Sequence, residues 1–166
     1  VQLWSGCRSG EVRGMLWSEI DRTGSVWVWR PAKHKLAHKG ITRAIALGPK
    51  AQAVLNQQRK KARASKGGKA APPGDLVFPC RGTTDKEHTA SVYGYCCLRS
   101  ARSVGIPRFR AYWARHSCRD RITAALGIEA ARSVLGHSQA AMTGQYGLDG
   151  RIVLGSGCAS YHTAPT

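Results

Sequence analysis

The stretch from Trp113 to Tyr146, WARHSCRDRITAALGIEAARSVLGHSQAAMTGQY, decides the fold. Apolar residues recur in it at helical spacing, and glycine interrupts the pattern at Gly127 and again at Gly136. Because glycine adopts the left-handed backbone that ends a helix at little cost, this pattern predicts a series of short helices joined at glycine caps. The predicted helices cover residues 113–126, 129–135 and 139–146.

Extended segments are predicted nearer the N-terminus. Val26–Trp29 is β-branched and aromatic, Ile41–Leu47 alternates apolar and polar residues, and a basic segment separates them. This pattern predicts an antiparallel β-hairpin with a basic tip. Helices are predicted before it, over 10–20 with Ser9 as the cap, and after it, beginning at Pro49. The expected fold class is therefore mainly α with a small antiparallel β-sheet (α+β).

The remaining segments are predicted from their glycines, prolines and charges. A dense basic run leads from Arg59 into Pro72-Pro73-Gly74, which predicts a solvated linker over 59–75. Another helix is predicted over 90–104, ending near Gly105. The tryptophans predicted to lie in the core are Trp27, Trp29 and Trp113. Residues 1–146 form one expected domain, and the tail 147–166 is left unassigned.

Composition limits the class of protein. The 166 residues include 26 Lys and Arg against 9 Asp and Glu, a formal net charge of +17, while 42% are hydrophobic. That apolar fraction is enough to build a core at this length, which argues against a wholly disordered tail. So large a positive charge favours a polyanionic partner, and nucleic acid is the commonest one.

The cysteines and the termini add further expectations. The six cysteines form no Cys-x-x-Cys pair and no zinc-type cluster, so neither a metal site nor a disulfide framework is expected, and reduced thiols suit a cytoplasmic protein. No run of residues is apolar enough to span a membrane. The chain starts at Val1 with no initiator Met, which suggests a protein truncated at its N-terminus.

Four motifs follow one another along the chain. They are Ser5-Gly6-Cys7-Arg8-Ser9-Gly10-Glu11, Ala114-Arg115-His116-Ser117, Leu135-Gly136-His137-Ser138 and, nine residues after His137, Tyr146. Together they resemble, in order and spacing, the motifs of the tyrosine recombinases, the phage-type integrases. The resemblance covers residues 1 to about 146 and implies the catalytic domain of such an enzyme.

That resemblance implies a mechanism that needs neither metal nor any other cofactor. The hydroxyl of Tyr146 would attack a DNA phosphodiester to give a 3′-phosphotyrosine, with Arg8 and Arg115 clamping the nonbridging oxygens. His137 would bind the phosphate or assist proton transfer. A hairpin lysine would protonate the leaving 5′ oxygen, and the sequence leaves two candidates, Lys35 and Lys39.

Other residues are expected to support this site. Glu11 would brace it by charge pairing, with Tyr112 and His116 alongside, although the family usually has His or Asn where Tyr112 stands. Gly144 also departs from the family pattern near the nucleophile. These departures, or truncation, leave open an alternative: a catalytically impaired, recombinase-derived DNA-binding module.

The expected partner is double-stranded DNA, bound by a homo-oligomer on paired sites, as in site-specific recombination or integration by a mobile element. Further DNA contacts are expected from the basic side chains of the hairpin and of the run after Arg59. They are Lys33, Lys60, Lys61, Arg63, Lys66 and Lys69. An RNA-binding basic protein is a more distant alternative, because the stacking platform and glycine motifs of the common RNA modules are missing.

Overall fold

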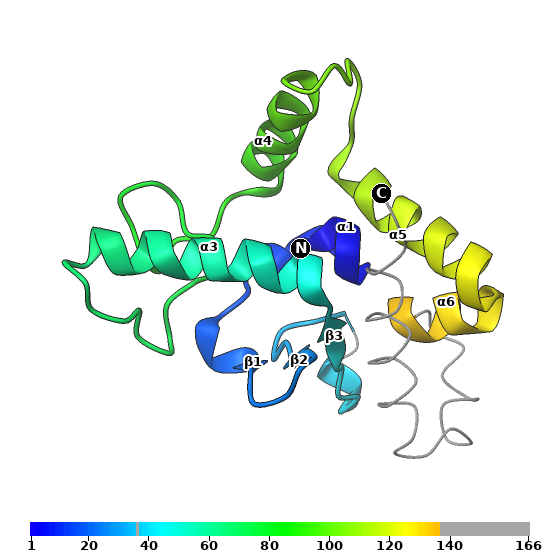
Figure 1. Ribbon diagram of the computed structural model, residues 1–166, viewed down its shortest axis with the longest axis horizontal. Coiled ribbons are helices and arrows are strands. Elements are labelled where there is room, and N and C mark those ends of the chain that lie inside the picture. The colour runs from blue at the N-terminus through cyan, green and yellow to red at the C-terminus, as the bar shows by residue number, and fades with distance from the viewer. Residues whose placement is uncertain (36, 137–166) are drawn as a thin grey trace.

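The structure is a computed structural model and describes residues 1–35 and 37–136. His137, Gly144, Tyr146, the helix predicted over 139–146 and the tail lie outside these residues. Figure 1 shows the arrangement of the elements along the chain. In order they are α1 (Gln2–Ser5), α2 (Ser9–Arg13), η1 (Trp17–Glu19), β1 (Ile20–Asp21), β2 (Trp27–Trp29), η2 (Ala37–Lys39), β3 (Ile45–Leu47), α3 (Pro49–Ser65), α4 (Ala90–Arg102), α5 (Ala111–Leu126) and α6 (Ile128–Leu135).

The described part of the chain has the expected fold class, mainly helical with one small antiparallel sheet. The strands lie in the order β1-β2-β3, and Trp29 pairs with Ile45 across the predicted hairpin. The sequence pattern did not predict β1, where Ile20 pairs with Trp29 on its other side. Two residues are too few to show an alternating pattern, so β1 depends on its neighbour.

The main core lies between the sheet, α2 and the first turns of α3. Trp29, Leu47 and Leu55 are fully buried there, together with Met15. Burying side chains of this size from water is the main favourable contribution to folding. The core therefore fixes the base of the hairpin against the N-terminal segment that carries the first arginine motif.

Two predicted boundaries were wrong. The helix expected over 10–20 is only Ser9–Arg13, followed by the short 3-10 helix, and its cap residue is Arg8 rather than Ser9. The basic run was expected to be a loop from Arg59, but α3 continues to Ser65. Lysine, arginine and alanine are good helix formers, so this run extends a helix that Pro49 has already started.

The helices predicted within the described residues after 89 are present. α4 begins behind Thr89, whose hydroxyl accepts the Val92 N–H at 3.3 Å. α5 ends at Gly127 and α6 at Gly136, where the φ angles are +84° and +61°. α6 packs against α5 through a second, smaller core. α1 bridges the two parts, since it contacts α5 as well as α3 and β3.

Trp113 was predicted to lie in the core and does not. Its side chain is 43% exposed, whereas Trp29 is fully buried and Trp27 packs partly buried against the main core. Trp113 lies near the start of α5, where its ring and that of Phe109 form a T-shaped pair. Among the described residues, no helix combines the length and the apolar character that crossing a bilayer requires.

Candidate active site

Arg8 and Glu11 form a pair at the start of α2. The Glu11 carboxylate accepts the Arg8 backbone N–H at 2.6 Å and the Arg8 guanidinium at 3.0 Å. An acid three residues after a helix cap satisfies a free N–H and suits the positive end of the helix. The Glu11 side chain is only 3% exposed, so it holds Arg8 by both backbone and side chain. The charge pairing expected from the sequence is therefore present.

Arg115 ties three helices together from its buried position on α5. Its Nη1 donates to the carbonyl of Gly6, at the end of α1, and its Nη2 donates to the carbonyl of Leu135, at the end of α6, over 2.7 Å. Nη2 of Arg8 lies 3.5 Å from the carbonyl oxygen of Gly136. The two arginines therefore meet at adjacent carbonyls, and the next residue in the sequence is His137.

Glycine is required at both ends of this arrangement. Gly6 has φ +64°, and a Cβ there would lie 2.6 Å from Cδ2 of Leu135. Gly136 has φ +61°, and a Cβ there would lie 2.0 Å from Nη1 of Arg43. A side chain at either position would strain the left-handed backbone and also displace a neighbour. The glycines of the first and third motifs thus allow the close approach of α1, α6 and the arginines.

Arg43 joins the site although none of the four sequence motifs contains it. Its Nε lies 3.3 Å from Oε1 of Glu11, and its Nη1 donates to the Leu135 carbonyl over 3.1 Å. A signal was available in the strand pattern. Side chains two apart along a strand share a face, and Ile45 and Leu47 of that face are buried. Arg43 is two residues before Ile45, so the same alternation predicts that its side chain faces the core side of the strand.

The site carries an excess of positive charge. The guanidiniums of Arg8 and Arg43 contact the carboxylate of Glu11, and that of Arg115 lies near both arginines, which leaves a formal surplus of two charges. Burial, followed by the neighbouring Arg8 and Arg43 charges, lowers the pKa of Arg115. Burial also lowers the pKa of Arg43, against the opposing effect of Glu11. Arginine stays charged at neutral pH despite such shifts, so the cluster suits an anion.

The lysine candidates lie on the long connection between β2 and β3. Lys33 and Lys35 are exposed, and within the described residues no hydrogen bond or ion pair joins Lys35 to the arginine cluster. Lys39 ends η2, in the same connection. Both lysine candidates therefore lie on the same segment as Arg43, which stands near the end of that segment.

Tyr112 and His116 pair with each other on α5. Their rings meet edge to face with centroids 4.4 Å apart. Tyr112 is 55% exposed, while Arg115, on the same helix, is buried. Tyr112 therefore faces solvent one turn before the arginine, supported by the imidazole one turn further along the helix.

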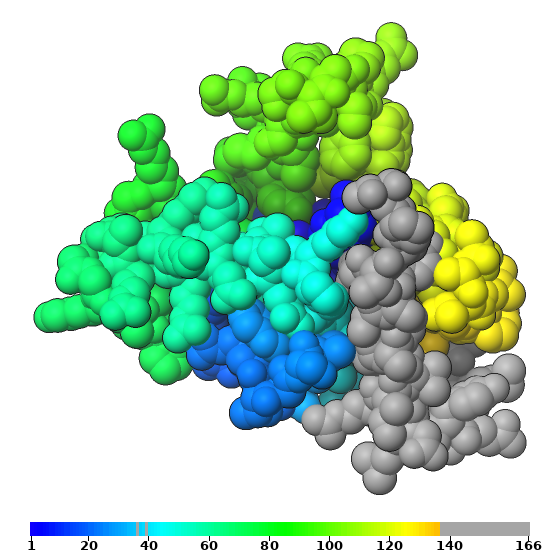
Figure 2. Space-filling model, in the orientation of Figure 1, coloured from blue at the N-terminus to red at the C-terminus, as the bar shows by residue number. Residues whose placement is uncertain are grey.

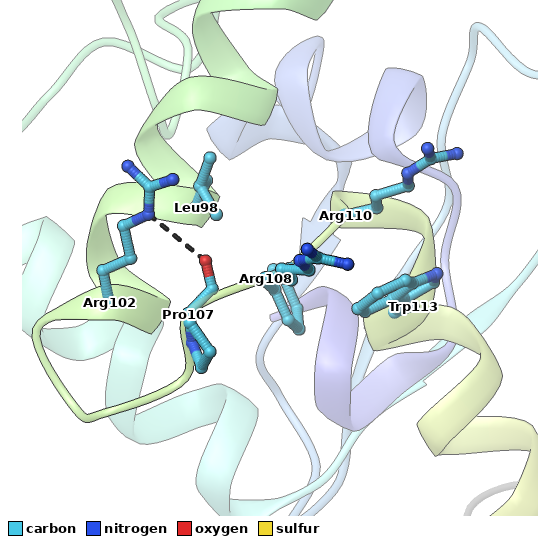
Figure 3. A pocket seen from close by; sticks show the side chains of 7 residues that line it. Leu98, Arg102, Pro107, Arg108, Arg110 and Trp113 are labelled. Atoms are coloured by element: carbon cyan, nitrogen blue, oxygen red, sulfur yellow. Dashed lines mark hydrogen bonds between the residues drawn. The ribbon is translucent and has the colours of Figure 1, made fainter.

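A groove between α4 and α5 adds positive charge outside the arginine cluster. It has a volume of about 440 Å³ and is lined by Leu98, Arg102, Pro107, Arg108, Phe109, Arg110 and Trp113. Figure 3 shows Arg108 and Arg110 leading into α5 beside Trp113, with Arg102 opposite on α4. Nε of Arg102 donates to the Pro107 carbonyl over 3.3 Å. The lining includes three arginines and no acidic side chain, and no sequence motif pointed to it.

The basic run covers the second half of α3, up to Ser65, and continues past its end through Lys66 and Lys69. Figure 2 shows this half at one edge of the molecule, on the left. Lys60, Lys61, Arg63 and Lys69 are exposed. Lys66 differs, because its ammonium pairs with the Asp75 carboxylate. The expected DNA-contacting side chains are thus available to solvent, with the exception of Lys66.

The described part of the chain holds unpaired cysteines but no group of side chains suited to a metal ion. The cysteines within the described residues, Cys7, Cys80, Cys96, Cys97 and Cys118, are free thiols. Across residues 1–35 and 37–136, no cluster of three or more His, Cys, Asp or Glu could hold a metal ion.

Comparison with known proteins supports this interpretation of the fold. The model of the phage integrase family matches residues 1–148. The fold is similar to that of the XerH site-specific recombinase bound to its difH substrate in a pre-cleavage complex, with a TM-score of 0.66 and 18% identity over 87% of this chain. It is also similar to the XerA recombinase, with a TM-score of 0.64 and 17% identity over 99% of this chain.

These similarities cover only part of the relatives. The chain spans 40% of the XerH chain and 57% of the XerA chain. None of the curated proteins matches the sequence. The family match covers most of the chain, and the fold agrees with the catalytic domains of tyrosine recombinases. The chain therefore belongs to the phage integrase family.

Proposed function

We propose that this chain is the catalytic part of an enzyme that cuts and rejoins DNA strands through a covalent tyrosine intermediate, in site-specific recombination. The observation that carries the proposal is the convergence of Arg8 and Arg115 on the adjacent carbonyls of Leu135 and Gly136. The sequence places His137 directly after them. Several copies are proposed to act on paired sites of double-stranded DNA.

The surplus positive charge supports a phosphate as the ligand of this site. A phosphodiester undergoing attack gains negative charge on its nonbridging oxygens, and fixed donors aimed at those oxygens lower the barrier. Arginine suits this role, because its planar fork holds two oxygens at once. In the proposed reaction Arg8 and Arg115 bind the phosphate, with Glu11 keeping Arg8 in place and Tyr112 and His116 at the side.

The covalent step balances without a cofactor. The Tyr146 oxygen forms a bond to phosphorus as the bond from phosphorus to the 5′ oxygen breaks. Lys35, or Lys39 in its place, donates a proton to the leaving oxygen, and His137 helps to transfer the tyrosine proton or binds the phosphate. Attack by the 5′ hydroxyl of another strand reverses the step and releases Tyr146.

The rest of the proposed DNA-binding surface is electrostatic. The exposed basic side chains of α3, the hairpin residue Lys33 and the groove between α4 and α5 offer cations for the phosphate backbone. Such contacts give affinity and position without reading sequence. They are proposed to hold duplex DNA while the arginine cluster engages a single phosphate.

Covalent trapping tests the proposal. Negatively supercoiled plasmid is a suitable probe, because denaturing the protein while it is bonded to a cut strand leaves the plasmid nicked and relaxed. We expect the parent chain to form an adduct that survives denaturation with detergent, and Tyr146→Phe to abolish it with DNA affinity unchanged. Tyr95→Phe, at a tyrosine that is 64% exposed on α4, is the matched control and should behave as the parent does.

The other outcomes are equally informative. An adduct that persists in Tyr146→Phe would exclude Tyr146 as the nucleophile. A parent chain that binds plasmid without forming any adduct would favour the alternative, a recombinase-derived DNA-binding module that no longer cuts.

A further inference from the structure

Arg43 connects the hairpin to the two arginine motifs. It lies two residues before β3, and its side chain is 9% exposed. One side of the guanidinium faces the Glu11 carboxylate and the other donates to the Leu135 carbonyl. Its contacts reach from the hairpin to α2 and to the last residue of α6, so one side chain links three segments that are distant in sequence.

Arg43 shares both of its partners with the arginines of the proposed site. Glu11 binds Arg8 as well as Arg43, and the Leu135 carbonyl accepts from Arg115 as well as Arg43. A carbonyl oxygen has two lone pairs and can accept two donors. The end of a helix also carries partial negative charge that favours cations. Arg43 thus completes a continuous chain of contacts that joins Arg8, Glu11, Leu135 and Arg115.

Stability alone does not explain an arginine at this position. Nε and Nη2 of Arg43 are buried without a hydrogen-bond partner, although Nε faces the Glu11 charge. Buried donors without acceptors are costly, and replacing buried ion pairs by apolar residues often stabilises a protein. A Cβ at Gly136 would lie 2.0 Å from Nη1 of Arg43, so a side chain there would displace this guanidinium. These unpaired donors favour an explanation of Arg43 that goes beyond stability.

We propose that Arg43 is a positioning residue for the recombination reaction. It fixes the end of α6 and the Glu11 carboxylate relative to each other, so that Arg8 and Arg115 face one phosphate. Because Arg43 and the lysine candidates belong to the same connection, it also anchors that segment beside the phosphate clamp. This inference rests on the proposed function.

The test compares Arg43→Gln and Arg43→Lys with the parent in the full chain. Glutamine removes the charge, while lysine keeps it but cannot bridge Glu11 and the Leu135 carbonyl with a planar fork. Arg30→Gln is the matched control, since Arg30 starts the same connection but forms an exposed ion pair with Asp21. If Arg43→Gln does not fold, Arg43→Lys carries the test.

Two measurements separate positioning from binding. The first is hydrogen exchange of the amides at the end of α6, which we expect to speed up in both Arg43 variants and not in Arg30→Gln. The second is the single-turnover rate of adduct formation on supercoiled plasmid, set against plasmid affinity. A small misplacement of reacting groups can cost about 10² in rate, so we expect a loss of that order in Arg43→Gln with affinity unchanged. Arg43→Lys should restore part of the rate.

Several results would overturn the inference. They are unchanged exchange at the end of α6, a parental rate in Arg43→Gln, or a loss of affinity parallel to the loss of rate, which would make Arg43 a direct DNA ligand. A parent chain that forms no adduct overturns the recombinase function, and the positioning role with it. An active parent with an active Arg43→Gln overturns the positioning role alone.

Discussion

The Arg115 guanidinium donates a hydrogen bond to the Leu135 carbonyl oxygen over 2.7 Å, across 20 residues of sequence. Its other donor reaches the carbonyl of Gly6, so a motif residue of α5 holds the ends of α1 and α6. Arg115 is 3% exposed, and its hydrogen bonds are made to backbone rather than to an acid. The arginine proposed to bind phosphate is thus also a structural residue, which affects how its variants must be interpreted.

Replacing Arg115 should destabilise the chain before any effect on chemistry is considered. Arg115→Ala leaves the Gly6 carbonyl without this donor and the Leu135 carbonyl with Arg43 alone, and an unsatisfied buried group costs about 1–3 kcal/mol. We expect the free energy of unfolding, measured by urea denaturation, to fall by about 1–3 kcal/mol. Arg119→Ala on the same helix removes an exposed pair with Asp120 and should cost less than about 1 kcal/mol. Equal losses in the two variants would contradict the anchoring role.

Gly136 should tolerate substitution worse than another left-handed glycine. Gly136→Ala adds a Cβ at 2.0 Å from Nη1 of Arg43, whereas a Cβ at Gly105, φ +83°, meets nothing within 4 Å. Gly105→Ala should therefore suffer only the backbone penalty, about 1–2 kcal/mol. Gly136→Ala should be destabilised more, and combining it with Arg43→Ala should recover part of the difference. Thermal unfolding of the variants measures this, and equal penalties at the two glycines would argue against the contact.

The basic half of α3 should contribute to the salt dependence of DNA binding. Each phosphate that the protein no longer neutralises reduces the magnitude of the slope of log affinity against log salt by about 0.9. We expect a reduction of about 0.9 for each of the two lysines that contacts a phosphate when Lys60→Gln is combined with Lys61→Gln. Fluorescence anisotropy on a DNA duplex at several salt concentrations measures this slope. Lys66→Gln should change the slope less, because Lys66 already pairs with Asp75. An unchanged slope in the double variant would make this half of α3 a solvated surface.

The groove between α4 and α5 predicts a separate effect. Arg108→Gln and Arg110→Gln remove two of its exposed guanidiniums. If both arginines bind phosphates, the magnitude of the slope of log affinity against log salt should decrease by about 2 in the double variant, with the stability of the fold unchanged. Arg22→Gln, at an exposed residue beyond β1, is a suitable control. Loss of adduct formation with full affinity and an unchanged slope would instead assign these arginines to the reaction.

Cys7 should be inert to alkylation in the folded chain. Burial raises the pKa of its thiol to about 11, so about one molecule in a thousand carries the thiolate at about pH 8. Cys96 is exposed and should react with iodoacetamide at that pH, as mass spectrometry can show. Equal labelling of both residues in the folded chain would contradict the burial of Cys7.

The same thiol makes stability depend on alkaline pH. Its pKa is higher in the folded chain than the ordinary thiol value of 9.0, so the unfolded state ionises first as the pH rises. The contribution of Cys7 is fully present below about pH 9 and is lost towards about pH 11. We expect Cys7→Ala to flatten the fall in unfolding free energy over that window, as measured by urea denaturation. An unchanged fall in the variant would assign it to other groups.

Much of the fold follows from local sequence. Gly127 and Gly136 end α5 and α6 because left-handed backbone there favours glycine whatever surrounds it. The hairpin follows from β-branched and aromatic residues on either side of a basic segment. Local patterns are less informative about where a helix ends. Arg59–Ser65 continues α3 because helix propagation needs only good helix formers once Pro49 has started the turn.

The sequence by itself determined the family, through the order and spacing of its arginine, histidine and tyrosine motifs, and it determined α5, the helix that carries the second arginine motif. Only the tertiary structure decided what those arginines touch. Arg43 meets Leu135 across 92 residues, and Trp113 stays at the surface although its residue type favours burial. Caps and periodicity depend on neighbours within a few residues, whereas a guanidinium shared between distant segments depends on how the packed elements bring those segments together.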